Sequence, residues 1–457
     1  MKKLVKNFTL LLSKLLTILL VSFSFISLVS CYGKPKQKNV IFILIDTLRA
    51  DHLSYYGYER DTTPNIDAFA KESLVFKNAF SPAPWTPAAM ASIFTGTYTT
   101  THGMVPPNSR EEALRAATKL SDKVYTLSEL FKDNGYYTMA VQTNPWLTET
   151  FGYAQGFDTY IHKNRIKAKA VNNEAYNLIN DYLANKENKN KPFYLYLHYM
   201  DPHNPYEAPR EYDRYYKDTI KGDYNDRAQE LIRRYDREIK YTDDKLGELF
   251  NFLKEKKLYK NSVIVFLTDH GEQFFERGHQ GHGFYLYNEE IHVPFFIRAK
   301  GHKGEVLQAV SSIDLFETLV DLNKLKNDKS TTQGFSLISK EGLEQRKRTD
   351  VLSEIKRKFQ QKAIITTNLN KLINEYSLET KDTDILNITP DKQRVFDISS
   401  DALEKKEVHD DNLFNRLNKR FIKVYSNVLK SKITLDKDDS LKMDEKTASE
   451  LKSLGYL

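Results

Sequence analysis

The sequence of 457 residues contains a single cysteine, Cys31. One cysteine cannot form a disulfide bond within the chain, and it excludes metal sites built from several thiolates. The sequence also contains no internal repeat and no low-complexity tract, which excludes a repeat architecture. The length leaves room for a large hydrophobic core, so we expect one large globular domain with a smaller appendage.

The chain also lacks a strong excess of charge. Its formal net charge is +7, but residues 1–30 contain four lysines and no acidic residue, so the remainder carries about +3. The basic residues of that remainder are accompanied by acidic residues throughout. The composition gives no argument for nucleic-acid binding, and we expect no nucleic-acid partner.

The N-terminal segment has the pattern of a secretory signal. Residues 1–7 are basic and residues 8–30 are apolar with scattered serines, so we interpret residues 1–30 as a signal peptide. The end of the run resembles the lipobox of bacterial lipoproteins, with Cys31 as the lipid-bearing residue and residues 31–38 as a linker. The expected location is the bacterial cell envelope, with a lipid anchor in the membrane and the protein facing the periplasm or the outer surface. The alternative is an uncleaved signal anchor, although Lys14 would be costly at membrane depth.

Four apolar runs predict buried parallel strands, and polar residues follow each of them. In open α/β sheets, ligands bind at the carboxyl ends of the strands. The four runs and the residues that follow them are 39–45 with Asp46, 136–142 with Asn144, 192–198 with the loop from Asp201 to His203, and 262–267 with Asp269 and His270.

The rest of the pattern completes an α/β fold, with a mostly parallel sheet flanked by helices. We predict a main domain over residues 39–325 and a smaller α+β subdomain with an antiparallel sheet over residues 326–457. The predicted helices cover residues 63–74, 127–134, 171–184 and 231–258, and further strands are predicted at 291–297, within 362–376 and at 394–398.

The segment from Ser81 to Gly103 is the centre of the functional hypothesis. Thr86, Pro87 and the alanine-rich run after them predict a helix with Thr86 as its N-cap. A hydroxyl at the positive end of a helix dipole lies where an anion or an alkoxide is stabilised. The alternative is a threonine that only caps its helix.

Carboxylates, imidazoles and a hydroxyl at one sheet edge indicate a metal site. Asp46, Asp269, His270 and Thr86 form a set that suits one hard or borderline divalent cation, and Mn, Zn and Ca all remain possible. Asp46 could instead cap the segment after it, and His203 could be a loop histidine bonded to the backbone.

Several motifs together resemble the sulfatase family of the alkaline phosphatase superfamily, over nearly all of residues 39–457. The resemblance implies an alkaline-phosphatase-like fold and a metal-dependent ester hydrolase. The motifs are IDTLRADHLSYYGYERDTTPNIDAFA, TPAAMASIFTG, FLTDHGE, GHGFYLYNEEIHVPFFI, RVFDISSDALEKKEVHDDN and the terminal LKSLGYL.

Carried over by position, the resemblance gives roles to individual residues. It implies Asp46, Asp269 and His270 as metal ligands, and Thr86 as a nucleophile that also touches the metal. It further implies that His203 and His282 contact the transferred group or the leaving oxygen. The lysine-and-histidine element of the family's sulfate pocket is replaced around Asn144, which we interpret as a substrate-binding residue.

The chain departs from the family pattern at its nucleophile. Sulfate-cleaving members carry Cys or Ser at position 86, which becomes formylglycine, and threonine cannot undergo that conversion. Residues 88–90 are Ala-Ala-Met where the family has Pro-Ser-Arg, and Thr47 stands where the family has a second acidic ligand. The remaining pattern resembles the threonine-nucleophile members that transfer phosphoryl groups, including phosphoethanolamine transferases.

The resulting hypothesis is a metal-dependent ester hydrolase or phosphotransferase that acts on phosphate esters through Thr86. The expected substrate is a phosphorylated or sulfated small molecule, or a glycan or lipid of the envelope. One alternative is a true sulfuric ester hydrolase. The other is a catalytically silent envelope lipoprotein that binds an anionic or host ligand.

Overall fold

The computed structural model describes residues 37–108, 111–112, 117–189, 191–222, 224–436, 440–441, 443 and 445–453. The predicted signal peptide, Cys31, most of the linker and the last four residues of LKSLGYL lie outside these ranges. Residues 39–457 form one compact unit. None of the described helices combines the length and hydropathy that crossing a bilayer requires.

A nine-stranded sheet forms the centre of this unit. Its strands are parallel except that β11 and the short β10 run against their neighbours, so the predicted mostly parallel sheet is confirmed. The order is β10 (His292–Val293), β2 (Leu74–Phe80), β11 (Phe295–Arg298), β7 (Ser262–Thr268), β1 (Asn39–Ile45), β6 (Phe193–Tyr199), β4 (Tyr137–Gln142) and β5 (Thr159–His162), with β12 (Gly304–Ser311) paired to β2.

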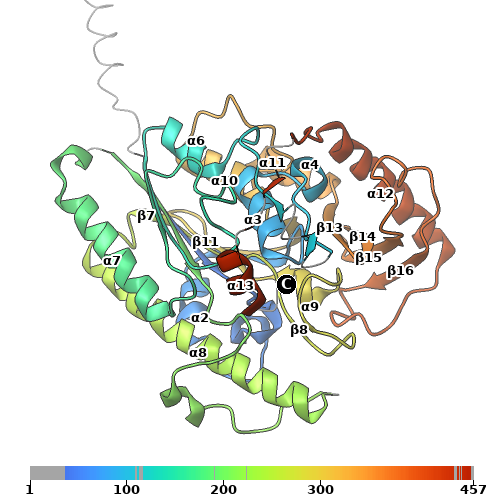
Figure 1. Ribbon diagram of the computed structural model, residues 1–457, viewed down its shortest axis with the longest axis horizontal. Helices are drawn as coiled ribbons and strands as arrows, with labels where there is room; N and C mark the ends of the chain where they lie inside the picture. The colour runs from blue at the N-terminus through green and yellow to red at the C-terminus, as the bar shows by residue number, and fades with distance from the viewer. Residues whose placement is uncertain are drawn as a thin grey trace, which may run out of the picture. The chain divides into compact units, whose positions relative to one another are not determined.

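Helices cover both faces of the sheet (Figure 1). The side chains of β1 alternate between the two faces: Val40 and Phe42 pack into one cluster, while Ile41 and Ile43 pack into the other. Fully burying one such side chain contributes roughly 1.5–3 kcal/mol. The first face is covered by α3 (Thr86–Thr95), α6 (Leu127–Asp133) and α10 (Asp314–Asn323), and the second by α2 (Pro64–Lys71), α7 (Ala168–Ala184) and α8 (Asp226–Glu255).

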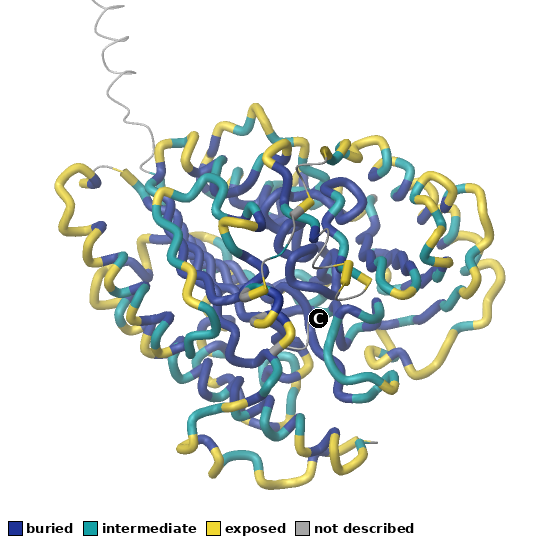
Figure 2. Tube along the Cα trace, in the orientation of Figure 1, coloured by how far each residue is buried: buried dark blue, intermediate teal, exposed yellow. Residues whose placement is uncertain are grey.

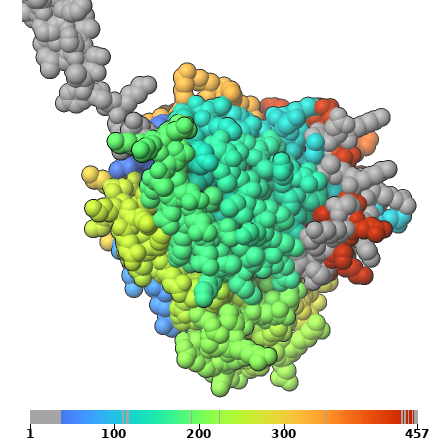
Figure 3. Space-filling model, turned by 60° about the vertical axis from the view of Figure 1, so that its left-hand side comes forward, coloured from blue at the N-terminus to red at the C-terminus, as the bar shows by residue number. Residues whose placement is uncertain are grey.

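The burial pattern agrees with this layered arrangement. Figure 2 shows the strands as a continuous buried layer, with exposed segments on the outer helices and loops. Figure 3 shows the face on which α7 and α8 lie at the surface. These two helices therefore shield one side of the sheet from water.

The four strands that we expected to end in polar residues are neighbours in the sheet. They lie in the order β7, β1, β6, β4 and are parallel to each other. Their carboxyl ends therefore meet at one edge, which confirms the predicted grouping of polar residues.

The predicted strand at 291–297 is two short strands, β10 and β11. Pro294 separates them, and proline has no N–H with which to continue a ladder. Both strands run antiparallel to β2, whereas the prediction gave no direction.

A four-stranded antiparallel sheet follows the large one, as predicted for the C-terminal part. One face packs on α12 (Asp411–Lys430), and the other packs on residues of the main sheet and its loops such as Phe80 and Leu286. Figure 1 shows α12 on the side of this sheet away from the large one. The strands are β13 (Val351–Arg357), β14 (Phe359–Ile365), β15 (Asn370–Tyr376) and β16 (Lys392–Asp397).

Short elements complete the described chain. They are η1 (Ala50–His52), η2 (Ser54–Tyr56), α4 (Thr99–His102), β3 (Ala117–Thr118), η3 (Lys186–Asn188), η4 (Arg210–Arg214), β8 (Gln273–Phe274), β9 (Gln280–Gly281), α9 (Asn288–Ile291), α11 (Lys340–Arg348), β17 (Ser440–Leu441) and α13 (Glu445–Ser453).

Candidate active site

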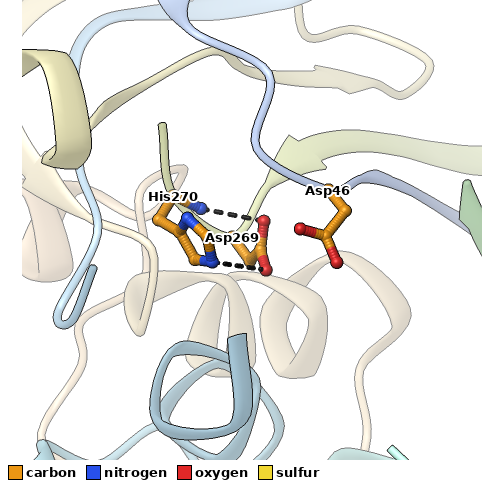
Figure 4. A group of neighbouring side chains, drawn as sticks. All are labelled: Asp46, Asp269 and His270. Atoms are coloured by element: carbon orange, nitrogen blue, oxygen red, sulfur yellow. Dashed lines mark hydrogen bonds and ion pairs between the residues drawn. The ribbon is translucent and has the colours of Figure 1, made fainter. Parts of the chain in front are cut away.

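Asp46, Asp269 and His270 lie together at the carboxyl edge of the large sheet. Asp46 follows β1, and Asp269 and His270 follow the neighbouring β7, where Ile45 pairs with Thr268. One potential ligand atom from each residue lies within 4.8 Å of the others. Figure 4 shows the Asp46 carboxylate facing that of Asp269, with the imidazole of His270 beside them. All three side chains are buried.

The next two strands hold one oxygen of Asp46. Asn144, after β4, donates from Nδ2 to Asp46 Oδ2 over 2.8 Å, and Nε2 of His198 in β6 lies 3.1 Å from the same atom. The hydroxyl of Tyr196 lies 2.7 Å from Nδ1 of His198. Asn144 therefore positions a candidate metal ligand, and the substrate contact that we expected of it stays a prediction.

Three further oxygens of the site make no hydrogen bond in the described part of the chain, although Nε2 of His270 lies 3.3 Å from Asp269 Oδ2 (Figure 4). Asp46 Oδ1, Asp269 Oδ2 and the Thr47 hydroxyl are buried and make no hydrogen bond among the described residues. An unpaired buried carboxylate oxygen is costly unless a cation is bound to it. The donor set of two carboxylates, an imidazole and hydroxyls therefore fits a divalent cation.

The pKa values of the two carboxylates move in opposite directions. Burial acts to raise the pKa of Asp46, but the hydrogen bond with His198 and the nearby imidazoles outweigh burial and hold it below its ordinary value. Burial, and then the charge of Asp46, raise the pKa of Asp269 to about 6. A cation between the two carboxylates would favour the ionised form of both.

Thr47 has a strained backbone at the same edge. Its φ is +58°, which is uncommon for a β-branched residue. Its N–H donates to Asp269 Oδ1 over 3.2 Å, and its carbonyl accepts from the Tyr235 hydroxyl over 2.7 Å. These contacts hold the strained turn in place, as is common at functional sites.

Thr86 places its hydroxyl at this cluster. Its Oγ1 lies 3.0 Å from Nε2 of His270. The predicted N-cap role is wrong, because Trp85 is the N-cap of α3 and Thr86 is the first helical residue. The hydroxyl contacts a candidate ligand instead of its own helix, while the positive end of the helix dipole lies beside it.

The tautomer of His270 suits a metal ligand. Its Nδ1 lies 2.9 Å from the carbonyl of Gly271, and a carbonyl can only accept, so Nδ1 carries the proton. Nε2 is therefore the ring nitrogen that faces Thr86 Oγ1 and Asp269 Oδ2 and that can bind a cation.

Two more histidines adjoin His270. The ring centroid of His282 lies 4.3 Å from that of His270 and 5.1 Å from that of His203. Nδ1 of His203 donates to the Asn204 carbonyl over 2.7 Å. Burial lowers the pKa of His203 to about 4 and that of His282 well below its ordinary value. The structure thus brings both predicted histidines to the site, in neutral form at pH 7.

Glu272 is a site residue that the sequence analysis did not assign. Its Oε1 lies 3.1 Å from Nδ1 of His282, and its Oε2 is buried without a hydrogen-bond partner. Burial raises the pKa of this carboxyl to about 7. Its place in the FLTDHGE motif, two residues after His270, was the available signal. His198 was also unassigned, although it lies in β6, a buried strand next to β1.

A pocket of about 270 Å³ lies against the two histidines. Thr86 and the candidate ligands are fully buried and do not line it. His282 connects the two regions, since it lines the pocket and its ring adjoins His270. The lining residues are Trp85, Pro106, Pro107, His203, Asn204, Glu272, Gln280, Gly281, His282, Phe284 and Arg357.

A family profile and the similar proteins of known name point to the same family. The sequence profile described as "Sulfatase" matches residues 38–324. The "Ulvan-active sulfatase" of Formosa agariphila is 25% identical over 360 residues, which cover 67% of each chain.

Solved structures of similar fold cover most of the chain. The structure of BT4656, titled as a complex with its substrate D-glucosamine-2-N,6-O-disulfate, matches with a TM-score of 0.67 at 17% identity, covering 87% of this chain and 98% of that one. A Vibrio parahaemolyticus protein of the alkaline phosphatase superfamily matches with a TM-score of 0.60 at 19% identity, covering 88% and 90%. The family profile covers more than half of the chain and establishes that the chain belongs to the sulfatase family, a family of hydrolases.

Proposed function

We propose that this hydrolase cleaves or transfers phosphate esters through a covalent intermediate on Thr86. The observation that carries the proposal is the 3.0 Å distance between Thr86 Oγ1 and His270 Nε2, within a buried set of candidate metal ligands. A nucleophilic hydroxyl needs an activating group, and at this distance Thr86 Oγ1 and His270 Nε2 are close enough to bind the same cation.

Asp46 Oδ1, Asp269 Oδ2, His270 Nε2 and Thr86 Oγ1 are the atoms that would hold one divalent cation. When bound, such a cation supplies Lewis acidity and lowers the pKa of a coordinated hydroxyl. Asn144 and His198 keep Asp46 oriented for this task through its other oxygen. Mn, Zn and Ca all remain compatible with the set.

The protein's own groups account for the proton balance. Thr86 Oγ1 forms a bond to phosphorus as the bond to the leaving oxygen breaks. His203 or His282, neutral at pH 7, accepts the proton of the hydroxyl and delivers it to the leaving oxygen. Water then attacks phosphorus as the bond to Oγ1 breaks, and one proton of the water returns to Oγ1. The N-terminal amides of α3 favour the negative charge that develops in both steps.

A threonine nucleophile favours phosphate esters over sulfate esters as substrates. A formylglycine diol can expel sulfate by returning to its aldehyde, whereas a threonine ester has no such route. Water must then attack the central atom, which is familiar chemistry for a phosphate ester. Met90, at the family's arginine position, is buried in the apolar core and offers no cation for sulfate.

Sulfate ester hydrolysis is the second candidate, and the comparisons favour it. Two of the similar proteins carry sulfate chemistry in their name or title: one is an ulvan-active sulfatase and the other was solved with a disulfated glucosamine. By analogy with them, the substrate would be a sulfated sugar.

An assay panel separates the two candidates. Metal-loaded wild-type protein, Thr86→Ala and Thr86→Ser would be compared on p-nitrophenyl sulfate, p-nitrophenyl phosphate, its diester and a phosphonate monoester. We expect a phosphate ester to react fastest, a loss of about a thousandfold in Thr86→Ala, and substantial activity in Thr86→Ser, which retains a hydroxyl. A sulfate ester as the best substrate, with Thr86→Ala inactive, would replace the first candidate by the second. Equal activity in Thr86→Ala would overturn both.

We further propose that Cys31 carries a lipid that anchors the protein in the cell envelope. The support is the apolar run that ends in Leu28-Val29-Ser30 before the single cysteine. Cys31→Ser should move the protein from the detergent phase to the aqueous phase in Triton X-114 partitioning. Unchanged partitioning together with normal maturation would argue against the anchor.

A further inference from the structure

The tip of the hairpin between β13 and β14 reaches the pocket beside His282. Arg357 ends β13 and pairs with Phe359 across the turn residue Lys358. The guanidinium Nη1 of Arg357 lies 3.4 Å from where a Cβ on Gly283 would be, directly after His282. The C-terminal sheet therefore contributes a cation to a pocket that the N-terminal part of the chain otherwise forms.

Among the described residues that line the pocket, Arg357 is the only lysine or arginine. In the part of the chain that the structure describes, its guanidinium makes no ion pair and no hydrogen bond, although it contacts the Phe284 ring at 5.2 Å. The nearby acid Glu290 is occupied, because its carboxylate accepts from the N–H groups of Gly283 and Phe284. A partly buried guanidinium without an anionic partner has unused donors, and a ligand anion can satisfy them.

The other walls of the pocket suit a flat or cyclic group. Trp85, Phe284, Pro106 and Pro107 provide apolar surface on its lining. The rings of sugars and aryl groups stack on apolar surfaces of this kind. The indole ring of Trp85 provides the largest such surface in the pocket. The pocket therefore combines a surface for a ring with one fixed positive charge.

We infer that Arg357 selects substrates whose leaving group is a ring that carries a second negative charge, such as a carboxylate, phosphate or sulfate. This inference rests on the proposed function, in which the ester group reacts at Thr86 and the leaving group occupies the pocket. Arg357 is a specificity-determining residue in this scheme and takes no part in the bond-breaking step.

Lys358 provides a matched control on the same hairpin. Its ammonium lies 5.8 Å from the centroid of the same Phe284 ring, but Lys358 is exposed and does not line the pocket. Neutralising Lys358 removes the same charge from the same turn. An effect of general surface charge would appear in both variants, whereas a bound anion contacts Arg357 alone.

The test compares the binding of two stable probes by calorimetry. Phenylphosphonate and 4-phosphonobenzoate differ only in the added carboxylate, and they would be titrated into metal-loaded wild-type protein, Arg357→Gln, Arg357→Lys and Lys358→Gln. We expect the wild type to bind 4-phosphonobenzoate about tenfold more tightly. The difference should vanish in Arg357→Gln, persist in part in Arg357→Lys and remain in Lys358→Gln.

Several outcomes would overturn the inference. They are equal affinities in the wild type, no binding of either probe, or a preference that persists in Arg357→Gln. The wild-type comparison stands even if Arg357→Gln does not fold. The calorimetry measures binding without turnover, so it can succeed where the proposed function fails. If Thr86-dependent hydrolysis is absent but the preference for 4-phosphonobenzoate depends on Arg357, the proposed function is refuted. The selection of a second negative charge by Arg357 is then still supported.

Discussion

The imidazole of His198 lies 3.1 Å from the carboxylate of Asp46, between Nε2 and Oδ2. The Tyr196 hydroxyl contacts the other ring nitrogen, so the ring is held between two partners inside β6. His198 fixes the orientation of a carboxylate whose second oxygen, Oδ1, is free to bind a cation. Partners of this kind decide how well a ligand binds its metal.

We predict that His198→Leu weakens divalent metal binding by about 10- to 100-fold, because Asp46 loses one of the donors that orient it. His198→Gln retains an N–H donor and should lose less. Competition with a chelating dye measures both affinities. A wild-type affinity in the folded leucine variant would show that the orientation of Asp46 does not depend on His198.

Thr47→Asp should strengthen metal binding by about tenfold or more, since a carboxylate replaces an unpartnered hydroxyl at the cation site. Aspartate also tolerates the left-handed backbone better than threonine does. Thr47→Asn shares that tolerance but adds no charge, and it is the matched control. The prediction fails if the aspartate variant binds Mn, Zn or Ca no more tightly than the asparagine variant.

The sequence predicted which residues lie at the carboxyl edge of the large sheet, because that prediction needs only the order of residues along each strand. Apolar runs identified β1, β4, β6 and β7, and the polar residues after them lay where parallel strands must end. His198 was missed because a histidine inside an apolar strand gives no sign of its partner. Arg357 was missed because only the folded hairpin brings it to His282. The Thr86 cap was predicted wrongly because a tertiary contact with His270 replaced the local one.

His102 should make the fold sensitive to acid. Its Nδ1 accepts from the N–H of Met104 over 3.2 Å, and its Nε2 lies 2.8 Å from the Ser92 hydroxyl, so the buried ring is neutral. Burial lowers its pKa to about 3. The unfolded chain binds a proton at about pH 6.5 and the folded chain does not, so the free energy of unfolding falls as the pH drops from about 6.5 to about 3.

The loss from His102 is at most on the order of 5 kcal/mol, because each pKa unit corresponds to about 1.4 kcal/mol. In His102→Gln, the difference in unfolding free energy between pH 7 and pH 4 should shrink, as measured by denaturant titration. His409→Gln, at an exposed position, is the control. An unchanged pH dependence in His102→Gln would refute the prediction.

Covalent transfer to Thr86 is the central claim, and rapid acid quenching during turnover, followed by mass spectrometry of the peptide that contains Thr86, tests it most directly. The account predicts a mass gain of one transferred group on Thr86 in the metal-loaded wild type and none in Thr86→Ala. Turnover without any modification of Thr86, at a rate that Thr86→Ala matches, would contradict it.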